Sequence, residues 1–400
     1  MHDDIRPTAP LIIIGAGLAG WTTVREFRKL DPATPVVLVT ADSGDFYAKP
    51  TLSNAYAQKR LPAQLVTTPA AKMVETLNVT LHAHSRVVNL DTAGHALTMV
   101  QDGLTTTLPY RQLVLATGAQ PVRIPVEGNA ANTVLSVNTL DDYAAFHQAL
   151  GVDASAAGPT AKGVAIMGAG LIGCEFANDL RLAGVTVAVV DPAPRPLAAL
   201  LPAPAGEALQ HALQAAGVQW HLGTTVARVD MRTEGKLLVT LASGDKLVAD
   251  LVLSAVGLRA DTALAQAAGL TCERGIVVDA LLQTSAPDVY ALGDSAQYAS
   301  AANRTLPYVM PIMNAARALA ATLAGTPTPL VFPIMPVSVK TPALPLVVAP
   351  PHPRHSGEWR AGDGDGIWQF LDGTGMQRGF VLAGAGTAKR MEQSRLTSAE

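Results

Sequence analysis

The chain has 400 residues, of which 49% are hydrophobic and 15% are charged, and its net charge is −3 from 29 basic and 32 acidic side chains. This composition is that of a globular protein, and the length predicts two or three domains, each with its own core. The near balance of charge argues against nucleic-acid binding, which uses a basic surface. The longest apolar runs, such as LIII and VVLV, are too short to span a bilayer, and the first residues, MHDDIRPTAP, lack the apolar centre of a signal peptide. We therefore expect a cytoplasmic protein.

Cysteine and histidine usage excludes several kinds of site. Cys174 and Cys272 are the only cysteines, which rules out a disulfide scaffold, a Cys-rich iron or zinc centre on this chain and a Cys-x-x-Cys or Cys-x4-Cys redox pair. The nine histidines are scattered along the chain. Two close pairs, at positions 82 and 84 and at 352 and 355, are interpreted as ordinary surface residues, so no metal site is predicted.

The first third of the chain alternates predicted strands and helices. An apolar strand over 11–14 leads into a glycine turn over 15–20, a helix over 19–30 and a second strand over 36–39. This order is that of a parallel βαβ unit. Further short strands are predicted over 79–82, 86–90 and 113–116.

A second unit of the same kind begins with a strand over 164–167. It continues through a glycine turn over 168–173, a helix over 174–183 and a strand over 185–190. The segment between the two units, GVDASAAGPTAKG at 151–163, is rich in Gly, Ala and Pro and is predicted to be an exposed connection.

The remainder changes character near residue 330. Before it, strands are predicted over 247–253, 276–278 and 289–292, and a helix over 310–324 ends at Gly325. After it, prolines interrupt the chain. Short strands over 337–340, 346–348, 368–371 and 380–383 predict a third, mostly β domain.

Each of the two glycine turns, GAGLAG at 15–20 and GAGLIG at 168–173, follows a strand and opens a helix, the context that dinucleotide binding requires. The first glycine permits a tight turn, the second lets the backbone approach a pyrophosphate, and the third lets helix and strand pack closely. The helix N-terminus then presents free N–H groups and a partial positive charge to the phosphates. Two such turns predict two dinucleotides, and one chain benefits from both when one passes electrons to the other.

Acidic residues near the ends of the second strands are candidates for binding ribose. Asp191 lies about 20 residues beyond the second glycine turn, where a carboxylate bonds both ribose hydroxyls of NAD and repels a 2′-phosphate. This favours NADH over NADPH, although Arg195 follows closely. In the first unit, Thr40 or Asp42 is the corresponding residue. Asp42 is our preference, but the sequence does not decide between them.

Three further segments carry a family resemblance. LVLATGAQP at 113–121, SAVGLRAD at 254–261 and TSAPDVYALGDSA at 284–296 resemble, in order, the crossover, the return segment and the second flavin signature of the two-dinucleotide-binding flavoproteins, the FAD-dependent pyridine nucleotide oxidoreductases. The resemblance implies that GAGLAG binds FAD and GAGLIG binds NADH. It also implies that Asp294 bonds a ribityl hydroxyl of FAD and that Gly293 admits the pyrophosphate.

The implied architecture is an α/β fold with two Rossmann-like domains and a small, mostly β C-terminal domain. The FAD-binding domain comprises 1–120 and 250–328, the NAD-binding domain at 121–249 is inserted into it, and the C-terminal domain is 329–400.

Many members of this family pass electrons to a Cys-x4-Cys disulfide, which this chain lacks. Instead YAKPTLS at 47–53 resembles the Y-x-[K/R]-P-x-L-S stretch of reductases that serve single-electron carriers. That resemblance implies that Lys49 lies near flavin N5 and meets the carboxylate of Glu175. Cys174 is interpreted as a small buried residue. The helix that begins near Pro311 is expected to direct its N-terminus at the flavin C2 carbonyl, where its dipole favours the charge of the reduced ring.

Longer stretches are similar to the rubredoxin-reducing branch of the family. These are ADSGDFYAKPTLS, GAGLIGCEFANDL, LPYVMPIMNAARALA and VSVKTPALPLVVAPP. They imply rubredoxin, a small acidic iron protein, as the electron acceptor, a monomeric state, and a place for Lys340 near the flavin or the partner. Weak electrostatic docking would need a local basic patch that includes Lys49, Lys59, Arg60 or Lys340. Ferredoxin, a quinone or oxygen remain alternative acceptors, and a signalling or DNA-binding flavoprotein remains an alternative class.

The motifs and the resemblance together define a candidate site. Lys49 and Glu175 are the expected orienting residues. The predicted cofactor contacts are Gly15, Gly17, Ala19, Gly20, Thr40, Asp42, Lys49, Pro50, Val87, Ala116, Thr117, Gly118, Arg123, Gly168, Gly170, Ile172, Gly173, Glu175, Asp191, Gly257, Gly293, Asp294, Pro311 and Lys340.

Overall fold

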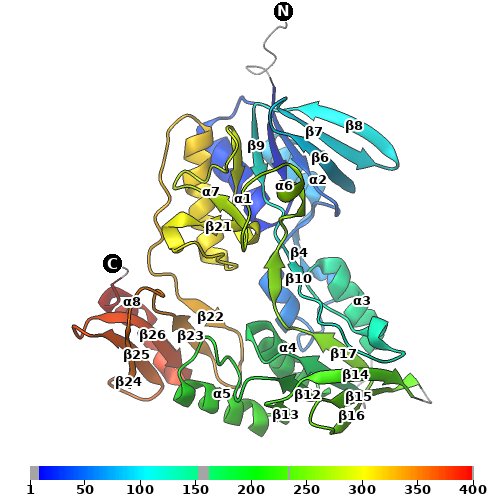
Figure 1. The fold of residues 1–400 in the computed structure, drawn as a ribbon, viewed down its shortest axis with the longest axis vertical. Coiled ribbons are helices and arrows are strands. Elements are labelled where there is room, and N and C mark those ends of the chain that lie inside the picture. Colours follow the sequence, from blue (N-terminus) through cyan, green and yellow to red (C-terminus); the bar gives the residue numbers. More distant parts are fainter. Residues whose placement is uncertain (1–8, 152–161, 233–234, 399–400) are drawn as a thin grey trace, which may run out of the picture. The chain divides into compact units, whose positions relative to one another are not determined.

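The computed structural model describes residues 9–151, 162–232 and 235–398, and most of the predicted connection at 151–163 lies outside these ranges. The chain divides into two compact units, which are described separately (Figure 1). Unit 1 contains the described residues up to Ala48, together with 66–120 and 258–333. Unit 2 contains 49–65, 121–257 and 334 onward.

Unit 1 is built on a five-stranded parallel sheet of order β20-β9-β1-β2-β5. Its strands are β1 (Leu11–Ile14), β2 (Val36–Val39), β5 (Thr80–His82), β9 (Gln112–Leu115) and β20 (Val289–Ala291). Strand β1 is apolar and buried throughout, as expected for the central strand of a sheet covered on both faces. Helices α1 (Leu18–Leu30) and α7 (Val309–Leu323) lie side by side against this core.

Smaller elements complete unit 1. A three-stranded antiparallel sheet of β6 (Ser85–Asp91), β7 (Ala96–Gln101) and β8 (Leu104–Pro109) projects at one side (Figure 1). The remaining helices and strands are α2 (Ala70–Leu77), α6 (Ala263–Ala267), and the pairs β3 (Phe46–Tyr47) with β4 (Val66–Thr68), β19 (Ile276–Val278) with β21 (Ala296–Tyr298), and β10 (Ala119–Pro121) with β18 (Leu258–Ala260).

Unit 2 is likewise built on a parallel sheet with helices. Its parallel sheet has the order β13-β12-β11-β17, with β11 (Gly163–Met167), β12 (Thr186–Asp191), β13 (Val218–Leu222) and β17 (Leu251–Ser254). The helices are α3 (Leu140–Leu150), α4 (Leu171–Leu182) and α5 (Ala203–Ala215), and an antiparallel sheet contains β14 (Val226–Met231), β15 (Leu237–Leu241) and β16 (Lys246–Ala249).

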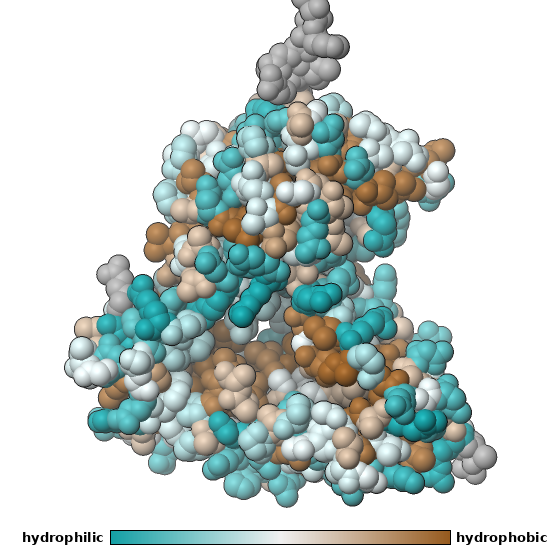
Figure 2. All heavy atoms as spheres, viewed as in Figure 1, coloured by the Kyte–Doolittle hydropathy of each residue, from teal (hydrophilic) through white to brown (hydrophobic). Residues whose placement is uncertain are grey.

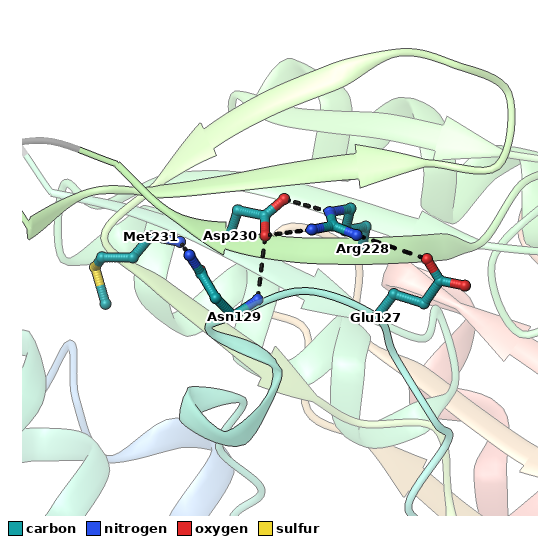
Figure 3. Close-up of polar contacts among 5 residues, drawn as sticks. All are labelled: Glu127, Asn129, Arg228, Asp230 and Met231. Atoms are coloured by element: carbon teal, nitrogen blue, oxygen red, sulfur yellow. Dashed lines mark hydrogen bonds and ion pairs between the residues drawn. The ribbon is translucent and has the colours of Figure 1, made fainter.

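A hydrogen-bonded loop secures the edge of β14 (Figure 3). The side-chain oxygen of Asn129 accepts the backbone amide of Met231 at 2.8 Å, while the backbone amide of Asn129 donates to the carboxylate of Asp230 at 3.1 Å. Arg228 lies between two carboxylates, 2.5 Å from Asp230 and 3.7 Å from Glu127. These contacts fasten the segment that enters unit 2 after residue 121 to the sheet.

The C-terminal part of unit 2 is an antiparallel sheet of order β22-β23-β26-β25-β24, drawn in orange to red in Figure 1. Its strands are β22 (Val337–Val339), β23 (Leu346–Ala349), β24 (Gly357–Ala361), β25 (Ile367–Asp372) and β26 (Gln377–Ala383), followed by the helix α8 (Arg390–Leu396). Buried side chains of this sheet, including Val348 and Val381, share one core with Cys174 and Phe176 of α4.

The predicted fold class, two Rossmann-like parallel sheets with a C-terminal β domain, is confirmed. Several predicted elements differ in detail, and two of these differences have a clear cause. The strand predicted over 247–253 is two strands, β16 and β17, because the chain turns at Asp250, whose carboxylate bonds Gly163 N and Lys236 Nζ, each at 2.7 Å. The helix predicted over 174–183 begins three residues earlier, at Leu171, because the glycine turn continues directly into it.

The surface is of mixed polarity. On the face shown in Figure 2, hydrophilic and hydrophobic residues are interspersed over both units. Within the described residues, no helix combines the length and the apolar character needed to cross a membrane.

Candidate functional site

In the first glycine turn of unit 1, the first and last glycines are closely packed and the middle glycine is open. Gly15 has φ +109°, and a Cβ there would lie 2.2 Å from the carbonyl oxygen of Ala116. A Cβ on Gly20 would lie 1.9 Å from the carbonyl oxygen of Gly15, so the helix packs directly on the turn. At Gly17, by contrast, no atom lies within 4 Å of an added Cβ. The turn therefore leaves its middle glycine accessible, as the approach of a pyrophosphate requires.

Helix α1 begins at this turn without a side-chain cap, since its N-cap residue is Gly17. The first backbone N–H groups of the helix thus have no partner from a capping side chain. Gly293, the start of a short 3₁₀ helix, approaches the first turn of α1 so closely that a Cβ on it would lie 2.9 Å from the Cβ of Ala19. The structure therefore brings Ala19 and Gly293, which are 293 − 19 = 274 positions apart in sequence, into close contact, and Asp294 follows directly.

Tyr298 fixes this second signature. Its buried hydroxyl accepts the amide of Gly293 at 2.8 Å and donates to the carbonyl of the same residue at 3.2 Å. Burial raises the pKa of Tyr298, so the hydroxyl stays protonated and can both accept and donate a hydrogen bond. The sequence analysis missed this residue.

The crossover residues lie at the carboxyl end of β9. Ala116 contacts the first glycine turn, as described above. Thr117 donates its hydroxyl to the carbonyl of Asp261 at 2.8 Å, and the amide of Asp261 donates to the carbonyl of Gly118 at 2.9 Å. The LATG segment and the return segment thus form one hydrogen-bonded pair.

The two candidates for the ribose of the first nucleotide are in direct contact. Thr40 is buried and donates its hydroxyl to Asp42 at 2.7 Å. The same carboxylate oxygen accepts the amide of Gly44 at 2.9 Å, and Asp42 itself is exposed. The hydroxyl therefore orients the carboxylate, which leaves Asp42 as the group that solvent reaches.

The second glycine turn reproduces the geometry of the first. Gly168 has φ +103°, and a Cβ there would lie 2.6 Å from the carbonyl oxygen of Ala255. A Cβ on Gly173 would lie 2.0 Å from the carbonyl oxygen of Gly168, whereas nothing lies within 4 Å of one on Gly170. Gly170 is also the N-cap of α4, again without a side-chain cap. Both turns therefore have the same open middle glycine and the same uncapped helix.

Asp191 lies beside the second glycine turn. It ends β12, and its two carboxylate oxygens accept the amides of Ala169 at 2.6 Å and Ala193 at 2.7 Å. A carboxylate has about four acceptor positions, so these two bonds orient the group and leave acceptor capacity. Arg195 is half-buried in the following loop, against Gly206 of α5.

A buried carboxylate lies one turn into α4. Glu175 is 2% exposed, and its oxygens accept the hydroxyl of Ser53 at 2.5 Å and the backbone amide of Lys340 at 2.9 Å. The ammonium of Lys340 donates to the carbonyl of Pro50 at 2.6 Å. Burial lowers the pKa of Lys340, and the charge of Glu175 opposes that effect. Three segments that are distant in sequence therefore meet here, and they contribute Glu175, Lys340, and Pro50 with Ser53.

The next turn of α4 continues these contacts. Asn178 accepts the amide of Ala343 at 3.0 Å, and Asp179 accepts the amides of Tyr56 at 2.8 Å and Ala57 at 3.3 Å. Asp179 is 4% exposed, and its burial raises its pKa to about 6, while the two amide bonds act in the opposite direction.

Lys49 lies at the start of the 3₁₀ helix η1 (Lys49–Asn54), and its ammonium is 3.4 Å from the side-chain oxygen of Asn138. Glu175, its expected partner, bonds Ser53 and Lys340 as described. Pro50 is the next residue of η1 and takes part through its carbonyl.

The other residues predicted to contact a cofactor lie in separate elements of the two units. Val87 lies in β6, partly buried against the core of unit 1. Pro311 is in the first turn of α7, which begins at Val309, one residue before the predicted start at 310. Ile172 is 37% exposed in the first turn of α4, and Arg123 and Gly257 are exposed in the segments that enter and leave the nucleotide-binding part of unit 2.

Sequence reasoning missed Ser53, Asn178 and Asp179. A signal was present, because polar residues at 175, 178 and 179 recur at helical spacing in the helix that also carries Cys174 and Phe176. Cys174 is fully buried and its pKa is raised by that burial, as its interpretation as a small core residue requires. No group of three or more metal-ligating side chains is found among the described residues.

Two parts of the chain match known family models. Residues 9–319 match the model of the pyridine nucleotide-disulphide oxidoreductases, and the protein belongs to this family. Residues 329–396 match a second model, the rubredoxin binding C-terminal domain.

Individual relatives have more specific names than the family. The chain is 45% identical to a rubredoxin-NAD(+) reductase of Acinetobacter baylyi over 95% of each chain, and 41% identical to one of Alcanivorax borkumensis over 96% of this chain and 97% of the relative. Among solved structures, it is similar to a covalent putidaredoxin reductase–putidaredoxin complex with a TM-score of 0.85 and 26% identity, over 97% of this chain and 93% of the other. The family resemblance inferred from the sequence is thereby confirmed.

Proposed function

We propose that the protein is an NADH-dependent flavoprotein reductase that passes electrons one at a time to rubredoxin. The observation that carries this proposal is the pair of matching cradles in one chain, each with an open middle glycine at the start of an uncapped helix. The family resemblance assigns the cradle of unit 1 to a bound cofactor and the cradle of unit 2 to a nucleotide substrate. The match of residues 329–396 to a rubredoxin-binding domain supports the identity of the acceptor.

The residues of unit 1 fit FAD. Gly15, Gly17 and Gly20 would hold the pyrophosphate at the N-terminus of α1, with Gly293 beside them. Asp294 would bond the ribityl chain and Asp42 the adenosine ribose. When bound, a flavin accepts two electrons together and releases them singly, which is the exchange that a hydride donor and a one-electron acceptor need.

NADH would bind in unit 2. The N-terminus of α4 binds its pyrophosphate at Gly168, Gly170 and Gly173, and Asp191 accepts hydrogen bonds from the ribose hydroxyls. The position of Asp191 is fixed beforehand by its bonds to Ala169 and Ala193. A 2′-phosphate would stand against this carboxylate, so NADPH is disfavoured.

Glu175 and Lys49 are the proposed orienting groups. Neither needs to act as a nucleophile, and their part is to hold segments and charge in place. Glu175 keeps Ser53 and Lys340 in fixed positions, and Lys49 presents a cation at the start of η1.

The acceptor must take single electrons. Both cysteines are free, and Cys174 is buried and lacks a sequence-near partner, so electron transfer by a disulfide on this chain is disfavoured. The balanced reaction converts one NADH and two oxidised rubredoxins to NAD⁺, one proton and two reduced rubredoxins. We propose a monomer organised as an FAD-binding domain (1–120 and 250–328), an NAD-binding domain (121–249) and a C-terminal domain (329–400).

A side-by-side comparison of acceptors tests the proposal. The purified, flavin-loaded protein is supplied with NADH and with rubredoxin, ferredoxin or a quinone at equal concentration. We expect rubredoxin to give the highest kcat/KM, and a clear preference for ferredoxin or quinone would overturn the assignment. A gel-shift at physiological salt addresses the DNA-binding alternative, for which we expect no shift.

A further inference from the structure

The backbone carbonyl of Pro50, the residue after Lys49, is a point of attachment for the start of η1. Its oxygen accepts the ammonium of Lys340 at 2.6 Å and the side-chain amide of Asn54 at 3.2 Å. Asn54 lies in η1 itself, whereas Lys340 directly follows β22 and is 290 positions from Pro50. Hydrogen bonds from a charged donor are shorter and stronger than neutral ones. The bond from Lys340 is therefore the stronger of the two, and it ties Pro50 to a different part of unit 2.

A second attachment lies three residues further along η1. The hydroxyl of Ser53 donates to Glu175 at 2.5 Å, and the other oxygen of that carboxylate accepts the backbone amide of Lys340 at 2.9 Å. These contacts form a closed ring, because Lys340 returns to Pro50 through its ammonium. Two attachments fix both the position and the direction of a short helix, where a single one would leave it free to turn about the contact.

Lys340 is also a cation near a buried carboxylate. Glu175 is 2% exposed, and a buried charge is costly unless hydrogen bonds or an opposite charge compensate it. Burial lowers the pKa of Lys340, while the attraction of Glu175 acts in the opposite direction. Removal of the cation would leave this carboxylate less well compensated. Lys340 is therefore joined to α4 by charge as well as by a hydrogen bond.

Lys49 lies next to this ring. It is the first residue of η1, and its ammonium is 3.4 Å from the side-chain oxygen of Asn138, which is 7% exposed. The backbone amide of Asn138 donates to Asp142 at 3.0 Å, beside the capping box of α3. Asn138 is thus held by a neighbouring helix, and the place of the Lys49 ammonium depends on where the start of η1 is held.

We propose that Lys340 is a positioning residue for the oxidation of NADH, because through the carbonyl of Pro50 it holds Lys49 in place. The inference rests on the proposed function. In that half-reaction NADH gives up a hydride, which the bound flavin takes up, and leaves as NAD⁺. The ring is attached to α4, which begins at the second glycine turn, so Lys49 has a fixed position relative to the proposed NADH site. A residue of the C-terminal segment therefore takes part in a step that precedes any contact with the electron carrier.

The primary test removes the cation and measures this half-reaction alone. Lys340→Met keeps the aliphatic stem but loses the donor to Pro50. Flavin bleaching by NADH is followed in an anaerobic stopped-flow experiment without rubredoxin. We expect the limiting rate to fall roughly tenfold, because a misplacement of about 1 Å is costly in a positioned site. The NADH concentration that gives half of this rate should change by less than about twofold, since the glycine turn is untouched.

Three further variants separate positioning from general damage. Lys340→Arg keeps a cation with several donors and should restore most of the lost rate. Lys340→Gln keeps a polar side chain that is too short to reach Pro50, and it should show the same fall as Lys340→Met if the methionine variant fails to fold. Lys389→Met is the matched control: Lys389 also donates to a backbone carbonyl, that of Asp363 at 2.9 Å, but this bond is exposed and lies elsewhere in the C-terminal segment. Its limiting rate should equal that of the parent.

The possible results distinguish the inference from the function on which it rests. An unchanged limiting rate in the Lys340 variants, or a fall that Lys389→Met shares, would overturn the positioning role and leave the reductase function intact. A higher half-saturating NADH concentration at an unchanged limiting rate would assign Lys340 to nucleotide binding and would also overturn it. A flavin-loaded parent protein that NADH does not bleach would instead overturn the proposed function itself.

Discussion

Glu175 accepts a hydrogen bond from the backbone amide of Lys340, 165 positions further along the chain, at 2.9 Å. Its second oxygen accepts the hydroxyl of Ser53, so one buried carboxylate joins three segments of unit 2. Because this carboxylate lies one turn from the glycine loop, α4 also fixes the start of the C-terminal sheet. A defect at Glu175 should therefore affect the packing of both.

Replacing Glu175 by Ala is expected to reduce stability. The substitution leaves the amide of Lys340 and the hydroxyl of Ser53 without their acceptor, at a cost of about 1–3 kcal/mol for each buried group. Urea denaturation measures the change in the free energy of unfolding, with Glu358→Ala on the exposed strand β24 as the control. Equal stability of the two variants would show that the buried contacts contribute nothing.

The two glycines of the second turn should respond differently to alanine. Gly170→Ala adds a Cβ with no atom within 4 Å, so the fold should be unaffected while the KM for NADH rises by roughly tenfold or more as the methyl group blocks the pyrophosphate. Gly173→Ala places its Cβ 2.0 Å from the carbonyl oxygen of Gly168 and should destabilise the protein by roughly 1–3 kcal/mol. Steady-state kinetics and thermal unfolding of both variants separate the two effects. An unchanged KM in Gly170→Ala would contradict the placement of NADH.

Asp191 should set the preference between the two nicotinamide nucleotides. Hydrogen bonds to a charged group contribute about 1.5–3 kcal/mol, so Asp191→Ala should lower kcat/KM for NADH by roughly ten- to hundredfold. The efficiency with NADPH should fall much less, because the repulsion of its 2′-phosphate is removed at the same time. The ratio of the two efficiencies is the measurement. A ratio equal to that of the parent protein would refute the role of Asp191.

The sequence predicted the two glycine turns better than the contacts around them, for a physical reason. Glycine turns are local: Gly15, Gly20 and Gly168 are required by contacts a few residues away or at the end of a neighbouring strand. The hydrogen bonds made by the side chains of α4 are not local. Asn178 and Asp179 meet their partners only after η1 and the C-terminal sheet have packed against the helix. Asp250 shows the same limit, since one apolar run became two strands only through its contacts with Gly163 and Lys236.

Asp179 should make stability depend on pH in an unusual direction. Its burial raises its pKa to about 6 in the folded protein, and the neighbouring charge of Glu175 adds to the effect. Between about pH 4 and 6 the folded state then binds more protons than the unfolded one, so the free energy of unfolding falls as pH rises through this window. The full cost, roughly 3 kcal/mol, is present above pH 6.

The variant Asp179→Asn tests this directly. Its side chain keeps an acceptor for the amide of Tyr56 but cannot ionise, so it should be more stable than the parent at pH 7 and nearly equal to it below pH 4. Urea unfolding at several pH values measures the difference. Parallel stability curves for the two proteins would show that Asp179 does not titrate in this range.

The cysteines should be dispensable for turnover. Cys174 is buried, its thiol donates to the carbonyl of Ala169 at 3.4 Å, and burial raises its pKa, so a thiol reagent should modify it only after unfolding. Cys272, which is partly exposed, should react first. A protein with both Cys174→Ala and Cys272→Ala should keep its rate of NADH-driven rubredoxin reduction. Loss of that rate, with flavin still bound, would point to a thiol in the electron path.

The central claim is that two nucleotide sites in one chain convert a hydride into single electrons for rubredoxin. Anaerobic stopped-flow mixing of the flavin-loaded protein with NADH, followed by oxidised rubredoxin, tests it most directly. We predict that NADH bleaches the visible flavin absorbance and that two rubredoxins are then reduced for each NADH consumed. A flavin that NADH leaves oxidised, or a reduced flavin that fails to reduce rubredoxin, would contradict the account.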